Sequence, residues 1–104
     1  MFQSVAVLGA TGSIGTSTLD VIRLHPDRFQ VLALSGWHQA EALGRLAGEF
    51  SPKTIVVAPG LAKTVRRVAG LAEGEAVVLE GADGLVQIAS AEQIDTVVTG
   101  VVGA

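Results

Sequence analysis

The stretch from Val5 to Gly15, which reads V-A-V-L-G-A-T-G-S-I-G, constrains the fold of this chain more than any other feature. Four apolar residues that suit a buried parallel strand run directly into glycines spaced G-x-x-G-x-x-G, and a helical pattern begins before the last glycine. Gly9 permits the turn out of the strand, Gly12 lets a phosphate approach the backbone, and Gly15 lets the helix pack closely on the strand. The stretch is therefore typical of a strand, a phosphate-binding loop and a helix.

The start of this helix favours a bound anion. Its first amides have no partner within the helix and lie at the positive end of the helix dipole, where a pyrophosphate satisfies them. Thr11 and Ser13 add hydroxyl donors at the same place. A structural turn without a ligand is the alternative, because a chain with 13 glycines can match the spacing by coincidence. The spacing also differs from the G-x-G-x-x-G of many dehydrogenases, so it does not identify a cofactor.

Length and composition indicate one domain with an apolar sheet. The chain has 104 residues, of which 49% are hydrophobic and 16% charged, and this balance suits a parallel sheet covered by helices on both faces. No apolar run approaches the roughly 18 residues that span a bilayer, and no signal peptide is recognisable, so we expect a cytoplasmic protein without a membrane partner. Cysteine is absent, which excludes thiol catalysis. The net charge of −3 argues against a nucleic-acid partner.

Strand and helix patterns alternate along the whole chain. We expect strands over 5–8, 29–34, 54–58, 76–79 and 95–98, helices over 13–24, 40–50 and 61–71, and a short helix near 85–89 that Asp83 caps. In the first helix, Ile14, Val21 and Ile22 are expected to face the sheet. Right-handed crossovers then give an α/β fold, a Rossmann-like doubly wound parallel sheet of about five strands in the order 3-2-1-4-5.

The segment after the second strand, Ser35 to Gln39, carries the second set of candidate binding residues. In this fold the end of the second strand lies beside the adenosine ribose, where an enzyme that prefers NAD usually places a carboxylate. This chain instead has Gly36, Trp37, His38 and Gln39 there. Ser35 can donate to a 2′-phosphate, His38 offers a donor or a cation, and Trp37 offers a face for adenine. The segment therefore favours NADP, although Trp37 as a loop anchor and His38 as a solvated residue are the alternatives.

A glycine-spaced stretch, T-G-V-V-G-A over 99–104, follows the last expected strand. Ligands of open parallel sheets bind at the carboxyl ends of the strands. We therefore expect this stretch to approach the inner phosphates or the nicotinamide. An ordinary turn from a strand to a helix is the alternative.

At this point the residues carry a resemblance to a known family. Residues 7–26, V-L-G-A-T-G-S-I-G-T-S-T-L-D-V-I-R-L-H-P, resemble the N-terminal signature of the 1-deoxy-D-xylulose 5-phosphate reductoisomerases. The G-S-I-G motif followed by S-T-L-D-V is far more specific than the glycine spacing alone. The E-F-S-P at 49–52 and the V-V-G-A at 101–104 are similar to the family as well, so the resemblance spans nearly the whole chain.

The resemblance implies an NADPH-dependent oxidoreductase and isomerase of the non-mevalonate isoprenoid pathway. Such an enzyme converts the sugar phosphate 1-deoxy-D-xylulose 5-phosphate to 2-C-methyl-D-erythritol 4-phosphate, uses magnesium or manganese, and is a homodimer at full length. By motif match, the pyrophosphate contacts are Thr11, Gly12, Ser13 and Ile14. Where the family commonly has a Gly-Lys-Asn-like segment, this chain has Trp37-His38-Gln39, so the resemblance assigns the lysine's role to His38 and the asparagine's to Gln39.

The family's metal-binding carboxylates, its substrate-phosphate residues and its mobile loop are expected beyond Ala104. We therefore expect residues 1–104 to form an NADPH-binding domain without the catalytic domain, inactive by itself and with no catalytic or metal-binding residue of its own. A cofactor domain of a semialdehyde dehydrogenase, or of an extended short-chain reductase or epimerase, is one alternative. The S-T-L-D-V motif speaks against both. A non-catalytic NAD(P)-sensing domain is a further alternative, because the same fold serves both purposes.

Overall fold

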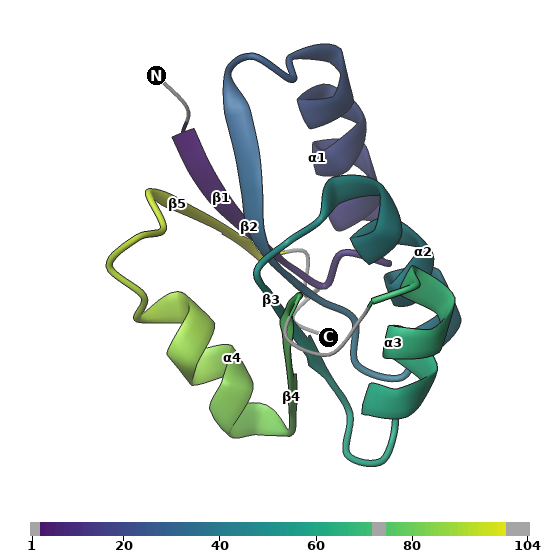
Figure 1. The fold of residues 1–104 in the computed structure, drawn as a ribbon. Helices are drawn as coiled ribbons and strands as arrows, with labels where there is room; N and C mark the ends of the chain where they lie inside the picture. The colour runs from purple at the N-terminus through teal and green to yellow at the C-terminus, as the bar shows by residue number, and fades with distance from the viewer. Residues whose placement is uncertain (1–2, 72–74, 100–104) are drawn as a thin grey trace.

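The computed structural model describes residues 3–71 and 75–99, and strands and helices alternate along them as expected (Figure 1). The elements are β1 (Gln3–Leu8), α1 (Ser13–Leu24), β2 (Phe29–Ser35), α2 (Ala40–Phe50), β3 (Thr54–Val57), α3 (Ala62–Ala69), β4 (Val77–Glu80), α4 (Ala82–Ala89) and β5 (Thr96–Thr99). The expected segments agree with these bounds to within two residues, apart from the start of α4, which lies three residues before the expected one.

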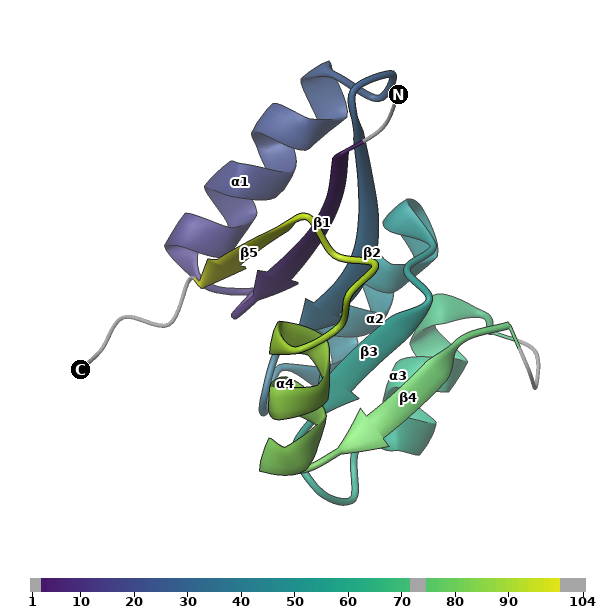
Figure 2. The ribbon, with the colours of Figure 1, turned by 90° about the vertical axis from the view of Figure 1, so that its left-hand side faces the viewer.

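The strands form one five-stranded parallel sheet in the order β4-β3-β2-β1-β5 (Figure 2). The α/β doubly wound class is therefore confirmed, and so is the neighbourhood of the first three strands. The expected place of the fourth strand was wrong. β4 pairs with β3 at the outer edge, where Thr54 lies opposite Val77, and β5 pairs with β1, where Leu8 lies opposite Thr99.

The strand order follows from which face of the sheet each helix covers. α1, α2 and α3 lie on one face and α4 on the other (Figure 1). Right-handed crossovers on one face all move the chain in the same direction, so three such steps carry it from β1 to β4. Two hydrogen bonds stabilise the third of these connections, from β3 through α3 to β4. The Val77 amide donates to the Lys53 carbonyl at 2.9 Å, and the Ala62 amide donates to the Glu80 carboxylate at 3.0 Å. Only α4 returns the chain across the other face.

The core has two parts because the sheet is buried on both sides. Val5 and Val7 of β1 face the helices α1 to α3, whereas Ala6 and Leu8 belong to the smaller cluster on the α4 side. All four side chains are at least nine-tenths buried. Burial on both faces explains why the strands have continuous apolar sequences instead of alternating ones.

A close approach to the preceding loop fixes how α1 lies on the sheet. A Cβ at Gly15 would lie 2.3 Å from the Gly9 carbonyl oxygen, so only glycine allows this contact. Gly15 therefore faces the sheet, together with Leu19 and Ile22 at the following helical positions. Ile14 and Val21, expected on this face, are instead 50% and 53% exposed. The expectation for Ile14 and Val21 was wrong because apolar spacing alone did not include the glycine contact.

The N-terminus of α4 also differs from expectation. Gly81, with a φ of 99°, is the residue that precedes the helix, and no side chain caps it. Asp83 lies within the first turn and is not the cap. Its carboxylate is still placed near the positive end of the helix dipole, where a negative charge is favourable.

An ion pair links α1 to α2 on the outer surface. Arg23 donates to Glu49 through Nε and through Nη2, the latter at 2.7 Å, and also donates to Asp20. Its guanidinium lies 5.1 Å from the ring centre of Phe50. The hydrogen bond from Arg23 lowers the pKa of Glu49, and the same bond raises the pKa of Arg23. Both side chains are more than a third exposed, so the ion pair contributes only modestly to folding stability.

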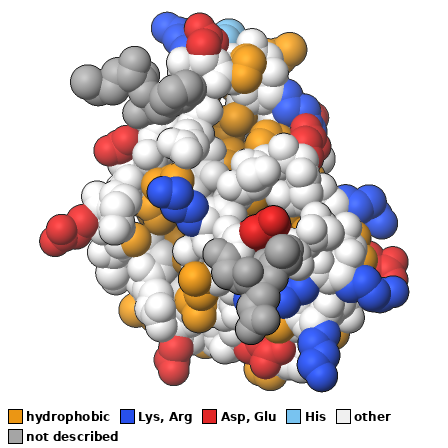
Figure 3. Space-filling view, in the orientation of Figure 1, with side chains coloured by type: hydrophobic (Ala, Val, Ile, Leu, Met, Phe, Trp, Pro, Cys, Tyr) orange, Lys and Arg blue, Asp and Glu red, His pale blue; other side chains and the backbone are white. Residues whose placement is uncertain are grey.

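None of the helices in the described ranges is both long and apolar enough to span a membrane. On the face seen in Figure 3, charged side chains of both signs are scattered and do not gather into a broad patch of one sign.

Adding one methyl group at either of two helical glycines is expected to have opposite effects. Gly15→Ala places a Cβ against backbone atoms that cannot move aside, so the free energy of unfolding falls by about 3 kcal/mol or more. Gly48→Ala in α2 is the matched control, since its Cβ would meet the nearest atom at 3.4 Å, an ordinary contact. There the better helix propensity of alanine raises stability by about 0.5–1 kcal/mol. Urea unfolding measures the free energy of unfolding of both variants. Equal changes in Gly15→Ala and Gly48→Ala would contradict the close contact at Gly15.

The Arg23–Glu49 pair is expected to make stability depend on pH. Because the folded pKa of Glu49 lies below its ordinary value, the stabilisation is present above the unfolded pKa and disappears as the pH falls through the folded pKa. Glu49→Gln therefore costs at most about 1 kcal/mol near pH 7 and almost nothing at an acidic pH below the folded pKa of Glu49. Urea unfolding at both pH values measures this, with exposed Glu92→Gln as the control. An equal cost at both pH values would refute the ionic origin.

Candidate functional site

The candidate site lies at the edge of the sheet where the strands end. Figure 2 shows all strands pointing the same way, with the start of α1 beside the ends of β1 and β5. Gly9 leaves β1 with a φ of 73°, which favours glycine, and its carbonyl accepts from the Gly12 amide at 3.0 Å. Residues 9–12, the glycine loop, thus make a tight turn directly into the helix.

The first turn of α1 presents unused backbone donors. Gly12 precedes the helix in an extended conformation, no side chain caps the helix, and no acidic residue lies in its first turn. The Gly12 carbonyl is already occupied by the Thr16 amide at 2.8 Å and the Thr16 hydroxyl at 2.6 Å. The amides of residues 13–15 precede the first amide that bonds within the helix, so this end suits an anion. Ser13 and Ile14 are exposed beside it, while Thr11 and Gly12 are half-buried.

Ser35, the last residue of β2, holds the glycine loop from beneath. Its Oγ accepts from the Gly9 amide at 3.0 Å, and its carbonyl accepts from the Ala10 amide at 2.7 Å. Ser35 is only 5% exposed and Ala10 is fully buried. The sequence pointed to Ser35 as a donor for a 2′-phosphate, but the structure places its hydroxyl under the loop. The signal that sequence reasoning missed is a small polar side chain directly after the apolar run from Val31 to Leu34.

The segment that follows, residues 36–39, bends away from the sheet beside the glycine loop. Gly36 is buried, and a Cβ there would lie 3.1 Å from the Thr11 methyl group, so the two loops touch. The Gly36 amide donates to the Val56 carbonyl at 3.2 Å, and the Ala58 amide donates to the Trp37 carbonyl at 2.8 Å. The end of β3 therefore holds this segment through backbone atoms alone.

The side chains of residues 37–39 are exposed at this edge of the sheet. Trp37 is 38% exposed, and its ring meets that of His38 edge to face, with 6.2 Å between their centres. Gln39 directly precedes α2 and makes no side-chain cap for it. The loop thus offers an aromatic face, an imidazole and an amide, one strand away from the uncapped start of α1. This arrangement suits an elongated ligand with a phosphate in its middle and a planar ring at one end.

The fifth strand completes the described part of this edge. Thr99 pairs with Leu8, so β5 ends beside the glycine loop. The expected contact of the stretch 100–104 with the ligand falls outside the described residues.

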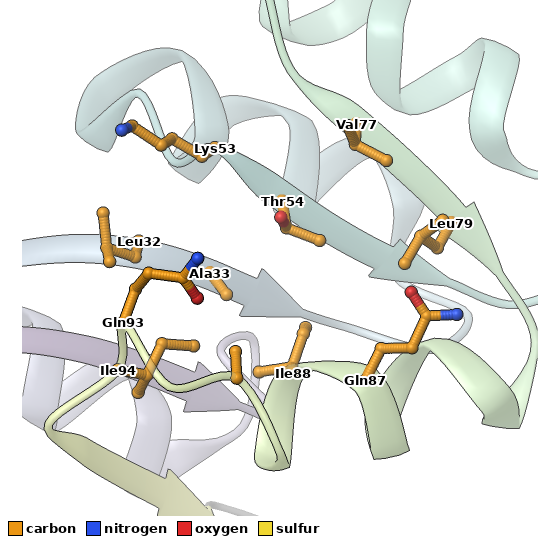
Figure 4. Close-up of a pocket in the computed structure, with 11 residues that line it drawn as sticks. Leu32, Ala33, Lys53, Thr54, Val77, Leu79, Gln87, Ile88, Gln93 and Ile94 are labelled. Carbon is orange, nitrogen blue, oxygen red and sulfur yellow. The ribbon is translucent and has the colours of Figure 1, made fainter.

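We also searched the described residues for metal-binding clusters and for cavities away from this edge. Within residues 3–71 and 75–99, no three His, Cys, Asp or Glu side chains come together in a way that could hold a metal ion. A cavity of about 390 Å³ lies between α4 and the sheet, where β3 and β4 begin (Figure 4). Its walls include Thr54, Leu79 and Ile88, and none of the candidate binding residues lines it.

Comparison with known proteins gives a consistent result. The model of the 1-deoxy-D-xylulose 5-phosphate reductoisomerase family matches residues 5–104. The proteins of that name from Pseudomonas putida strain F1 and Geobacillus kaustophilus are 49% and 46% identical, over 98% and 95% of this chain. The chain spans about a quarter of the length of these curated relatives, 26% and 25% respectively.

Solved structures of similar proteins have the same fold. A DOX-P reductoisomerase in complex with magnesium superposes with a TM-score of 0.83 at 44% identity, covering 93% of this chain and 24% of that one. A complex with NADPH, fosmidomycin and magnesium gives 0.82 at 45%, covering 91% and 23%. The Zymomonas mobilis protein in complex with NADPH gives 0.76 at 40%, covering 86% and 23%.

Proposed function

Because this chain belongs to the 1-deoxy-D-xylulose 5-phosphate reductoisomerase family, we propose that it supplies the NADPH-binding part of such an enzyme. The reaction of the parent enzyme would convert 1-deoxy-D-xylulose 5-phosphate to 2-C-methyl-D-erythritol 4-phosphate in non-mevalonate isoprenoid biosynthesis. The family match favours this function over a semialdehyde dehydrogenase, a short-chain epimerase or a nucleotide sensor.

One observation supports the proposal: the uncapped start of α1 lies next to the 36–39 segment, in which residues 37–39 are exposed, and Ser35 joins the two. A dinucleotide needs both parts, because its pyrophosphate and its adenosine bind at neighbouring strand ends. The free amides at the start of α1 can donate to the pyrophosphate, and the glycines of the loop allow it to approach the backbone closely. The similarity to the NADPH complexes supports the identity of the ligand.

We assign the roles within the site as follows. The glycine loop and the first turn of α1 bind the pyrophosphate through Gly9, Thr11, Gly12, Ser13 and Ile14. Of these, Ser13 and Ile14 are the exposed positions.

The adenosine end is assigned to the 36–39 segment, Gly36, Trp37, His38 and Gln39. The exposed ring of Trp37 stacks on the adenine, while His38 and Gln39 contact the 2′-phosphate. No carboxylate stands among these four residues, which favours a phosphorylated ribose over one with a free 2′-hydroxyl.

The proposal assigns no chemical step and no metal ligand to this chain. The described residues offer no group of three side chains for a divalent cation, so magnesium or manganese would bind other residues of the parent enzyme. The sugar phosphate would be held there too, and residues 1–104 are proposed to act as an NADPH-binding domain that is inactive alone. We also propose a cytoplasmic, homodimeric parent enzyme.

Titration of this chain with NADPH and, separately, NADH is the direct test. Trp37 is the only tryptophan and lies in the proposed site, so bound NADPH should quench its fluorescence. We expect NADPH to bind at least about tenfold more tightly, since one phosphate contact readily supplies the required 1.4 kcal/mol or so. Calorimetry provides a check without fluorescence. Equal affinities would reject the proposed 2′-phosphate site, and the absence of binding to a cooperatively folded chain would reject the cofactor role.

Replacing the imidazole at position 38 should remove part of this preference. His38→Ala is expected to weaken NADPH binding about tenfold and leave NADH binding unchanged, because only the 2′-phosphate contact is lost. His25→Ala is the matched control, since His25 follows the far end of α1. Calorimetry with both cofactors measures the effect. A parallel loss for NADPH and NADH would argue against a contact between His38 and the 2′-phosphate.

A further inference from the structure

We propose that Ser35 is a positioning residue for the pyrophosphate half of the cofactor site, and that its hydroxyl sets the geometry of the glycine loop without touching the ligand. The inference rests on the proposed NADPH-binding function, which it deepens. It differs from the role that the sequence indicated for Ser35, a direct donor to the 2′-phosphate.

The contacts of Ser35 place its hydroxyl behind the binding surface. Its Oγ accepts from the Gly9 amide at 3.0 Å while its carbonyl takes the Ala10 amide at 2.7 Å, so both bonds end on the glycine loop. At 5% exposure the side chain has little surface left for a ligand. Ser35 is also the one buried polar side chain among the described residues, which indicates that its hydrogen bond compensates for its burial.

The hydrogen bond from the Gly9 amide to Ser35 Oγ restrains the conformation of the glycine loop. Gly9 adopts a φ of 73°, its carbonyl closes the turn with the Gly12 amide, and the same carbonyl faces Gly15 of α1. The Ser35 hydroxyl therefore holds the peptide before Gly9, while the Ser35 carbonyl, the Gly12 amide and the close approach of Gly15 hold the peptide after it. Without the Ser35 acceptor, a partly buried donor lacks its partner, and the loop gains freedom to turn toward water.

The 36–39 segment does not depend on this hydroxyl. It is held by the bond from the Gly36 amide to the Val56 carbonyl and by that from the Ala58 amide to the Trp37 carbonyl, both between backbone atoms. The Leu43 amide also donates to the Gln39 carbonyl at 2.9 Å. Loss of the Ser35 hydroxyl should therefore affect pyrophosphate binding and leave adenosine binding intact.

The test separates the two halves of the cofactor. NADH carries the pyrophosphate without the 2′-phosphate, adenosine 2′-monophosphate carries the 2′-phosphate without the pyrophosphate, and NADPH carries both. For Ser35→Ala we expect NADPH and NADH to bind about five- to tenfold more weakly, with adenosine 2′-monophosphate changed by less than about twofold. NMR titration measures all three. Ser35→Thr, which keeps the acceptor oxygen, should restore most of the affinity.

A second readout needs no ligand. The Gly9 amide should exchange its hydrogen faster in Ser35→Ala than in wild type, with Ser35→Thr close to wild type. Ser4→Ala is the control, because Ser4 lies in β1 at the opposite end of the sheet and only its backbone bonds to Asp95. It should change neither the exchange at Gly9 nor the three affinities.

The outcomes are distinguishable from failure of the proposed function. If wild type binds none of the three ligands, NADPH binding itself is wrong. If wild type binds and Ser35→Ala weakens adenosine 2′-monophosphate but not NADH, the hydroxyl contacts the 2′-phosphate and the positioning role is overturned. Equal weakening of all three ligands, or of none, also overturns it.

Discussion

The contact between Gly15 of α1 and the carbonyl of Gly9 is the constraint on which the rest of this structure depends. It brings the helix against the loop that precedes it, and so decides which face of α1 meets the sheet. The same contact points the start of the helix past the end of β1, where its free amides become available. The packing of α1 and the position of its uncapped start thus both depend on one residue that tolerates no side chain.

Burial on both faces stabilises the sheet, and the candidate site lies at the ends of its strands. Val5 and Val7 pack in the core on one side of the sheet, and Ala6 and Leu8 pack in the core on the other. The side chains of these four residues are therefore buried and cannot contact a ligand. The candidate binding residues therefore lie beyond the strands, in turns that the sheet positions. This separation is usual for parallel sheets, in which loops carry the site and strands carry the fold.

Sequence alone predicted every strand and helix of the described residues, because apolar strand runs and helical spacing are local patterns. It also predicted the turn at the glycine loop that joins β1 to α1. It misplaced β4, since helical periodicity does not state which face of the sheet a helix will cover, and the strand order depends on that choice. The roles of Ile14, Val21 and Ser35 were missed for a related reason: each depends on a contact with a residue that no local pattern identifies.

Because backbone hydrogen bonds hold the 36–39 segment, its side chains can be substituted during evolution while its path is kept. Val56, Ala58 and Leu43 hold its path through amides and carbonyls, which every residue except proline provides. Substitutions of the exposed side chains of His38 and Gln39 should therefore change folding stability little, as is usual at exposed positions. Under the proposed function, an exchange of lysine for histidine here would change the contacts to the nucleotide while the scaffold stays the same. The departure of Trp37-His38-Gln39 from the Gly-Lys-Asn-like pattern is the kind of variation that this arrangement permits.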